Sequence, residues 1–144
     1  MPETGVHVWL LLWKATRALE AHAHASLQGL GMCPGDFAVL EALLHKGPLP
    51  VNAIGKKVLL TSGSMTAAID RLEERGLVER RDDPEDRRTR IIHLTAEGRK
   101  IIRRLFAIHE RDMERAVSVL NAGEREELSG LLRKLGRSAE GKEI

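Results

Sequence analysis

Aromatic residues and cysteine are scarce in this chain, and both shortages exclude classes of function. Aromatics make up 3% of the 144 residues, and tyrosine is absent. A surface that stacks the bases of single-stranded nucleic acid needs several aromatic rings, so this sequence supplies such a surface poorly. The single cysteine, Cys33, excludes a disulfide within the chain and is typical of a protein from a reducing compartment.

The sequence also lacks the motifs of the common enzyme classes. It contains no glycine-rich phosphate loop, HExxH, GxSxG or close cysteine–histidine arrangement. The acidic pairs Glu73-Glu74 and Asp82-Asp83 fall in stretches that we expect to be solvated, where nothing would prepare them for acid–base catalysis. CxxC and HxxxH spacings are missing as well. We therefore predict no enzymatic activity, no metal site and no cofactor.

Long apolar runs are missing too. The longest run, Val8 to Trp13, is far shorter than the roughly 20 residues that a membrane-spanning helix needs. The N-terminus shows neither the basic start nor the small-residue cleavage site of a signal peptide. These features predict a cytoplasmic protein that has no membrane partner.

What remains is the composition of a folded domain. Of the 144 residues, 42% are hydrophobic and 31% are charged, which suits a packed core and argues against disorder. The length suits one domain. The formal net charge of +2 permits a polyanionic partner without requiring one. Arginine outnumbers lysine, as expected for bidentate recognition.

Apolar spacing and turn residues predict a mainly helical fold with one small β-hairpin. Thr95 is placed to cap one of the helices, and Asn121 with Glu124 forms the sequence pattern of a capping box for the last helix. That helix is expected to end near Gly136, with a frayed tail from Arg137. The other predicted helices span 4–30, 35–45, 51–58, 61–76 and 96–120, and the predicted strands span 77–81 and 88–94 on either side of a turn over 82–87.

The first predicted helix is apolar on two sides. Val6, Trp9 and Trp13 form one row at helical spacing, while Val8 and Leu12 belong to a second row. Such a helix either is buried in its own domain or packs against another copy of the chain. We favour a dimer helix, because a chain of this length has little mass with which to cover both sides.

The helix predicted over 61–76 separates bulky apolar groups from small and polar ones. Met65, Ala68, Ile69 and Leu72 fall on one stripe about 100° wide. Short side chains on the opposite side would let the helix enter the major groove of DNA and contact base edges or phosphates. An ordinary amphipathic helix with a solvated side would show the same pattern. The outward side carries Gly63, Ser64, Thr66, Ala67, Asp70 and Arg71.

The predicted hairpin adds a second element directed at a DNA groove. Arg87, Arg88 and Arg90 lie at or just after its tip, where an arginine could enter the narrow and strongly negative minor groove. The stretch 79–90 is electrically balanced, with five acidic residues against five arginines. Geometry rather than net charge therefore favours DNA here.

Two acidic residues near these arginines have a physical role available to them. Asp70 or Asp86 could hold one arginine so that another points outward. The alternative is a solvated run of charges without fixed pairs.

The stretch LLTSGSMTAAIDRLEERGLVERRDDPEDRRTRIIHLTAEGR closely resembles the recognition helix and wing of MarR-type transcriptional regulators. The first helix, the GMCPGDFAVLEALL and VNAIGKKV helices and the two closing helices follow in the same order, so the resemblance covers almost the whole chain. It implies one winged helix-turn-helix domain, with a DNA-binding lobe over 35–95 and dimerisation helices over 1–30 and 96–144. It also implies a homodimer that binds double-stranded DNA at a pseudo-palindromic operator. Such proteins repress nearby genes until a small molecule or an oxidant releases them.

Residue by residue, the resemblance assigns DNA contacts to the recognition helix and the wing. Arg88 matches the wing arginine, with Asp70 or Asp86 as its brace. The residues that match major-groove or phosphate contacts are Ser62, Ser64, Thr66 and Arg71. With their outward neighbours, the predicted DNA-contacting residues are Thr61, Ser62, Ser64, Thr66, Ala67, Arg71, Arg87, Arg88 and Arg90.

The family's ligand pocket lies between the dimer helices and the DNA-binding lobe. There, tryptophan and phenylalanine would stack on an aromatic ligand, and Arg17 would meet a carboxylate. Trp9 and Trp13 would equally fill the core of a dimer, so both roles stay open. The residues expected to line such a pocket for a small-molecule effector are Trp9, Trp13, Arg17, Phe37, Glu41 and His109.

Cys33 departs from the pattern of the peroxide-sensing members, whose reactive cysteine lies in the first helix. It precedes Pro34 at the start of the second predicted helix, where a helix N-terminus can activate a thiol. An oxidant sensor is one interpretation of this position. A packed, inert thiol is the interpretation that we favour.

A non-specific architectural DNA-binding or interaction protein would share this fold but lack a response to an effector. Phosphate contacts alone give binding that falls steeply with salt and shows little sequence preference. A regulator should instead prefer its operator by several kcal/mol.

Overall fold

The computed structural model describes residues 3–58 and 62–141, over which the chain forms six helices and a three-stranded sheet. The predicted fold class, mainly helical with a small β wing, is confirmed. Along the chain the elements are α1 (Gly5–Gly29), α2 (Pro34–Lys46), β1 (Leu49–Pro50), α3 (Val51–Val58), α4 (Ser62–Glu74), β2 (Val78–Asp82), β3 (Arg90–Leu94), α5 (Ala96–Ala116) and α6 (Ala122–Ala139).

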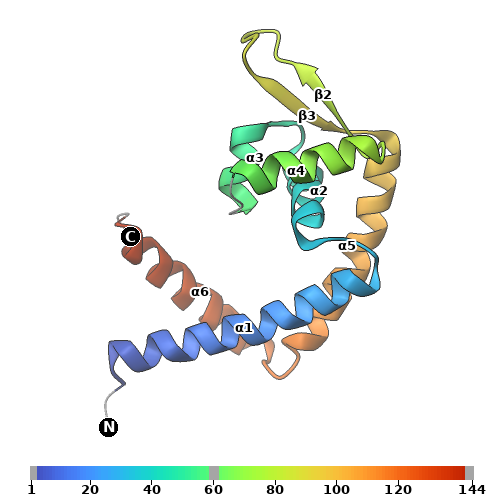
Figure 1. The fold of residues 1–144 in the computed structure, drawn as a ribbon. Coiled ribbons are helices and arrows are strands. Elements are labelled where there is room, and N and C mark those ends of the chain that lie inside the picture. Colours follow the sequence, from blue (N-terminus) through green and yellow to red (C-terminus); the bar gives the residue numbers. More distant parts are fainter. Residues whose placement is uncertain (1–2, 59–61, 142–144) are drawn as a thin grey trace.

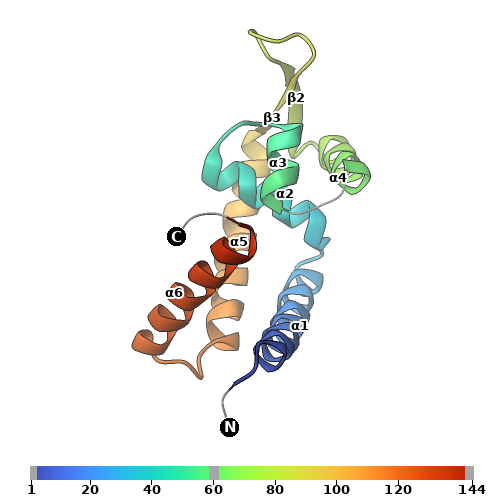
Figure 2. The same ribbon diagram turned by 90° about the vertical axis from the view of Figure 1, so that its left-hand side faces the viewer.

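The molecule has two parts, a compact lobe and a pair of long helices beside it (Figure 1). The lobe holds α2, α3, α4 and the wing, while α1 and α6 extend away from it to one side. α5 joins the two parts, because it begins at the base of the wing and contacts α1 further along. In Figure 2, α4 is seen almost end-on at the flank of the lobe, with the wing above it. α4, the predicted recognition helix, and the wing are thus both accessible from outside.

The hydrophobic core lies in the lobe. α2 packs against α3, α4 and α5, and the side chains of Leu40, Ile54 and Ile92 are fully buried. The apolar stripe predicted for the recognition helix is confirmed, because each of its members is at most 2% exposed. These members are Met65, Ala68, Ile69 and Leu72.

The wing contains one strand that the apolar pattern did not predict. β3 pairs with both β2 and the short β1, so that Leu49 lies opposite Ile92 in the order β1-β3-β2. A two-residue strand that ends in a proline shows no alternation, so a pattern cannot reveal it. The predicted hairpin is confirmed but is shifted along the chain. Its strands span 78–82 and 90–94, and residues 83–89 form the tip.

Both predicted caps within the described residues are present. Thr95 Oγ1 accepts a hydrogen bond from the N–H of Gly98 at 3.0 Å, and Asn121 and Glu124 form the capping box. Two predicted helix ends are wrong. α5 ends at Ala116, where a tight turn over 117–119 follows, and α6 continues to residue 139. A single glycine costs a helix only about 1 kcal/mol, so Gly136 does not end α6.

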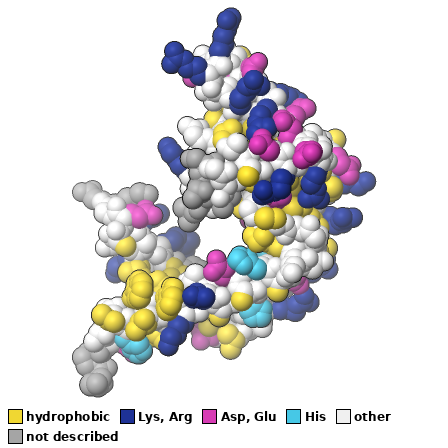
Figure 3. Space-filling model, in the orientation of Figure 1, with side chains coloured by type: hydrophobic (Ala, Val, Ile, Leu, Met, Phe, Trp, Pro, Cys, Tyr) yellow, Lys and Arg dark blue, Asp and Glu magenta, His cyan; other side chains and the backbone are white. Residues whose placement is uncertain are grey.

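Exposed apolar surface is concentrated on α1 and α6. None of the residues of α6 is buried, and Leu131 is 58% exposed. On α1 only Leu27 is buried, and Trp9 is 61% exposed. In Figure 3, hydrophobic side chains gather over the N-terminal half of α1. No helix within residues 3–58 and 62–141 is long and apolar enough to cross a membrane.

Candidate nucleic-acid interface

The predicted recognition helix, α4, presents small and polar side chains to solvent. Ser64, Thr66 and Ala67 are exposed near its N-terminal end, opposite the buried stripe. Side chains this short leave room for the edge of a DNA groove to approach the helix backbone. Ser62 begins the helix, while Thr61, which we expected to cap it and to contact DNA, lies outside the described residues.

The base of the wing uses its charges in ion pairs within the protein. Arg81 pairs with Glu79, and Arg90 Nε lies 3.2 Å from Asp82 Oδ1. Arg80 is paired as well, with two carboxylates of α4. Three of the five hairpin arginines are therefore already engaged by acidic side chains.

The tip of the wing is ordered by two aspartates. Asp86 Oδ1 accepts a hydrogen bond from the backbone N–H of Arg88 at 3.0 Å, and its Oδ2 accepts one from Thr89 Oγ1 at 3.1 Å. Asp83 Oδ1 accepts one from the N–H of Glu85 at 2.9 Å. Asp86 thus supports the backbone of the predicted wing arginine rather than its guanidinium.

Arg87 and Arg88 project from this tip and are exposed. Neither has an ion pair among the described residues, because the nearby aspartates are turned toward the backbone. Figure 3 shows basic side chains at the end of the wing. The hairpin is electrically balanced as a whole, yet it offers unpaired cations at its tip, as insertion into the minor groove requires.

The predicted brace between Asp70 and Arg88 is wrong. Asp70 Oδ1 lies 2.5 Å from Arg80 Nη2, and Glu73 Oε1 lies 2.8 Å from Arg80 Nη1. Partial burial lowers the pKa of Arg80, but the hydrogen bonds and charges of Asp70 and Glu73 outweigh this effect and raise the pKa above its ordinary value. Asp70 therefore binds an arginine of β2, at the base of the wing, and not Arg88 at its tip.

The partner of Arg71 is a residue that sequence reasoning missed. Asp36, in the first turn of α2, is 3% exposed and is the one buried charged residue in the described part of the chain. Its Oδ1 accepts hydrogen bonds from Arg71 Nη2 at 2.7 Å and from Nε at 3.2 Å. These bonds, with the charge of Asp36, raise the pKa of Arg71. Asp36 falls on the same face of α2 as Leu40 and Leu43, which is buried. A buried carboxylate needs a partner, so the helical spacing of these residues could have indicated that Asp36 is paired.

The expected pocket residues form two separate groups. Trp9 and Trp13 stack on α1 with their ring centroids 6.0 Å apart, and Arg17 Cζ lies 5.4 Å from the centroid of the Trp13 ring. All three side chains are exposed. This group is therefore open to solvent within a single chain.

The second group lies between α2 and α5. Phe37 contacts His109 edge to face, with the ring centroids 4.9 Å apart. Glu41 Oε1 lies 4.0 Å from His45 Nε2 on the same helix. One chain therefore does not bring the six residues of the predicted pocket together.

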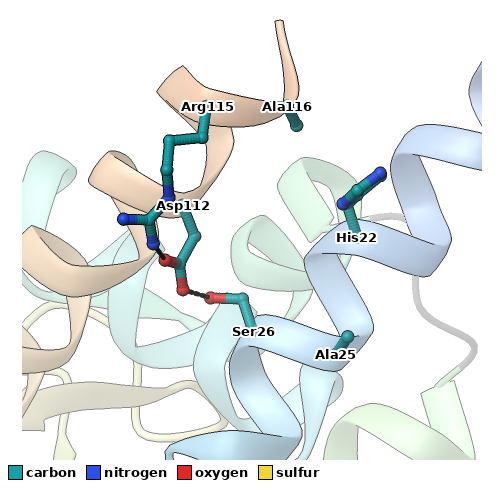
Figure 4. A pocket seen from close by; sticks show the side chains of 6 residues that line it. All are labelled: His22, Ala25, Ser26, Asp112, Arg115 and Ala116. Atoms are coloured by element: carbon teal, nitrogen blue, oxygen red, sulfur yellow. Dashed lines mark hydrogen bonds and ion pairs between the residues drawn. The ribbon is translucent and has the colours of Figure 1, made fainter.

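A cavity of about 330 Å³ lies between α1 and α5 (Figure 4). Ser26 Oγ donates a hydrogen bond to Asp112 Oδ2 at 2.6 Å, and His109 Nδ1 lies 3.2 Å from the same hydroxyl. The hydrogen bond from Ser26 lowers the pKa of Asp112, and Arg115 adds to this against the opposing effect of burial. Sequence reasoning did not single out these residues as a group. The lining residues are His22, Ala25, Ser26, Asp112, Arg115 and Ala116.

Ser26→Ala should lower the melting temperature by a few degrees at pH 7 and leave it almost unchanged in strong acid. A carboxyl whose pKa is depressed by folding adds stability above its unfolded pKa of about 4, and this stability is lost as the pH falls through the folded pKa of Asp112. Thermal melts from pH 2.5 to 7 measure the difference, with Ser129→Ala on the exposed α6 as the control. A difference that stayed constant with pH would indicate lost packing instead.

Cys33 is exposed, so the interpretation of a packed thiol is wrong. It is the residue before the first turn of α2, and its side chain makes no capping hydrogen bond. This position at the edge of the lobe leaves the sulfur outside the core. Across residues 3–58 and 62–141, no group of three or more His, Cys, Asp or Glu side chains could hold a metal ion.

Known proteins resemble this chain in both sequence and fold. Residues 34–89 match the model of the MarR family. Over 139 residues the chain is 34% identical to the HTH-type transcriptional regulator MhqR of Bacillus subtilis, and the match covers 96% of each protein. The chain belongs to the MarR family. It is a DNA-binding transcriptional regulator, which confirms the prediction that it is not an enzyme.

Solved structures extend the comparison to the fold. A regulator from Streptomyces coelicolor in complex with DNA is 27% identical, with a TM-score of 0.83 over 96% of this chain and 90% of that one. BpsR of Bordetella bronchiseptica, whose DNA binding is regulated by 6-hydroxynicotinic acid, is 26% identical, with a TM-score of 0.81 over 94% of this chain and 98% of that one. The MarR fold thus extends over almost the whole chain.

Proposed function

We propose that this MarR-family regulator is a homodimeric repressor that binds a pseudo-palindromic operator and is released by a small molecule or an oxidant. The observation that carries this proposal is the pairing of a recognition helix with a small outward face and a wing with unpaired arginines at its tip. Two such lobes, placed about one DNA turn (~34 Å) apart, would contact two half-sites. We expect the protein to act in the cytoplasm, alongside the DNA that it binds.

In this proposal each lobe contacts two grooves of the duplex. The exposed side of α4 enters the major groove, where Ser64 and Thr66 contact bases or phosphates and Ala67 meets a thymine methyl group. Arg88 enters the adjacent minor groove, with Arg87 and Arg90 near the phosphates. The dipole at the start of α4 adds a favourable interaction with phosphate.

A second copy of the chain is the proposed occupant of the apolar surface on α1 and α6. The two helices border an apolar groove of about 460 Å³. Exposed leucines are costly in water, and a surface continuous over two helices is typical of an interface between copies. Trp9 and Trp13 would enter this interface as well. The residues that line the groove are Glu3, Val8, Leu11, Leu12, Ala15, Leu128, Leu131, Leu132 and Leu135.

The proposed response to an effector works through the distance between the two recognition helices. A ligand bound near the junction of α1, α2 and α5 would change the angle between the lobe and the dimer helices. The recognition helices would then no longer match the spacing of the half-sites. A ligand that released DNA without altering this distance would contradict the mechanism.

Selection from random duplex DNA by the purified protein at physiological salt tests the proposed function. We expect one palindromic motif with half-sites about one turn (~34 Å) apart. A folded dimer that recovered no motif, and whose binding fell steeply with salt, would indicate a non-specific architectural protein. The selected operator then serves for ligand-release screening.

Arg88→Ala should weaken operator binding by about 1–3 kcal/mol while leaving the dimer intact. Its guanidinium is the group placed for the minor groove, and its side chain has no ion pair among the described residues whose loss would disturb the fold. Fluorescence anisotropy on the selected operator measures the effect. Arg133→Ala on α6 removes the same charge outside the lobe and should bind normally. Normal operator binding by Arg88→Ala would contradict the assignment of Arg88 to the minor groove.

A further inference from the structure

Ion pairs hold the recognition helix α4 on both sides of its exposed face. At 100° per residue, Arg71 and Glu73 lie about 200° apart around the helix axis, which places them on opposite sides. Arg71 is bound by Asp36 of α2, whereas Glu73 and Asp70 are bound by Arg80 of β2. Of the side chains proposed to contact DNA, Thr66 and Ala67 lie on the arc between Arg71 and Glu73, and Ser64 lies about 20° beyond Arg71.

The first ion pair joins α4 to the interior of the lobe. Asp36 has a side chain that is 5% exposed, and both of its oxygens accept hydrogen bonds from Arg71 Nε, at 3.2 and 3.3 Å. Arg71 Nη2 donates a third, to Oδ1 at 2.7 Å. A carboxylate and a guanidinium in this forked geometry fix direction as well as distance. The Arg71 side chain remains 49% exposed, so it is held at the surface of the lobe.

The second set joins α4 to the wing. Arg80, whose side chain is 23% exposed, reaches Glu73 Oε1 at 2.8 Å and Asp70 Oδ1 at 2.5 Å. The backbone N–H of Arg80 also donates a hydrogen bond to Glu73 Oε2 at 3.2 Å. One residue of β2 thus holds two carboxylates of α4, and the base of the wing is attached to the recognition helix.

We propose that Asp36 and Arg80 are positioning residues for DNA recognition, which fix the rotation of α4 about its own axis from its two sides. This inference rests on the proposed entry of α4 into the major groove. Side-chain ends lie about 5–6 Å from a helix axis, so a rotation of 20° would move them by about 2 Å. Hydrogen bonds to bases tolerate only a few tenths of an ångström. The buried stripe of α4 packs against apolar neighbours and has no directional contact of comparable precision.

The direction in which Asp36→Asn changes DNA affinity distinguishes a positioning role from a purely electrostatic one. Asp36→Asn removes a negative charge from a lobe that approaches a polyanion, so attraction to DNA of any sequence should stay the same or increase. If Asp36 holds Arg71 and α4 in place, binding to the operator should nevertheless weaken. Suppose a variant loses affinity for the operator but keeps or gains affinity for other DNA. The cause would then be a misplaced α4 and not weaker electrostatic attraction.

The experiment measures binding of the full-length protein to the selected operator and to a random duplex of equal length at one salt concentration. For Asp36→Asn we expect operator affinity to fall about tenfold, with random-duplex affinity unchanged or higher. Combined with Arg71→Gln, Asp36→Asn should cause no further loss beyond that of Arg71→Gln alone, because it acts through Arg71. Glu114→Gln, which removes a carboxylate–arginine pair between α5 and α6, should leave both affinities unchanged.

Other outcomes would overturn the proposal in distinct ways. Equal losses on both duplexes, or no loss on either, would mean that Asp36 does not position the recognition helix. If Asp36→Asn fails to fold, the combination of Asp70→Asn with Glu73→Gln decides, because both side chains are exposed and face Arg80. That variant should show the same loss of operator preference, and a retained preference would overturn the proposal. A wild-type protein without operator preference would instead contradict the proposed function.

Discussion

Gly98→Ala is expected to destabilise the protein by about 3 kcal/mol and to lower its melting temperature by roughly 10 °C. A Cβ atom at this position would lie 1.9 Å from the carbonyl oxygen of Leu77 and 2.8 Å from its carbonyl carbon. Both are backbone atoms, so no side chain can turn away to make room. The same carbonyl oxygen accepts a hydrogen bond from the N–H of Thr95 at 3.1 Å, at the junction of the wing with α5.

Thermal and urea unfolding at fixed protein concentration measure the effect of Gly98→Ala. Gly130→Ala is the matched control, because Gly130 lies within α6 and a Cβ there would meet no atom within 4 Å. That change should raise stability by about 0.5–1 kcal/mol, since alanine favours a helix over glycine. If Gly98→Ala melted at the wild-type temperature, the close approach of α5 to Leu77 would be wrong.

Leu132→Asp is expected to separate the proposed dimer and to lower operator affinity by about 10²- to 10⁴-fold. Leu132 is 41% exposed on α6 and lines the apolar groove with Leu128, Leu131 and residues of α1. In the proposed dimer this position is buried, and an aspartate there would lose its water without gaining a partner. A single lobe would then bind its half-site without the benefit of the linked second lobe.

Sedimentation and operator titration measure the two consequences of Leu132→Asp. Gly130→Asp introduces the same charge on the opposite side of α6 and should remain a dimer with normal operator affinity. The circular dichroism spectrum of Leu132→Asp should keep the helical content of the lobe, which has its own core. A dimer that persisted in this variant would contradict the assigned interface.

The sequence was sufficient to predict the helix α4 and the two halves of the hairpin, because a helical period marks the first and turn residues mark the second. The stripe of α4 repeats with the helical period, and a turn that contains Pro84 separates the two strand-like stretches of the hairpin. β1 could not be found, since its two residues form a strand only by pairing with Ile91 and Ile92 from a distant part of the chain. Helix ends depend on local hydrogen bonds that propensity does not determine.

The candidate site was predictable as a set of side chains but not as a set of partners. The exposure of Ser64, Thr66 and Arg88 follows from their place on a helix or a hairpin tip. The pairing of Arg71 with Asp36 joins residues 35 positions apart, and the pattern of α2 shows only that Asp36 needs a partner, not which residue supplies it. The choice of Arg80 over Arg88 as the partner of Asp70 depends on how far the wing extends from α4, which is a property of the assembled lobe.

The balance of charge in the wing has a consequence for how the protein searches a genome. The two exposed arginines at the tip attract DNA only over short distances, because salt screens their charges. At the base of the wing, each arginine charge is offset by a paired carboxylate. We therefore expect the wing to add little to the attraction toward arbitrary DNA, of which a cell offers about 10⁶–10⁹ competing sites. A regulator with a strongly cationic wing would be held on these sites and would need many copies to fill one operator. If the chain binds an operator as proposed, we expect such a wing to leave more of the molecules free to reach it.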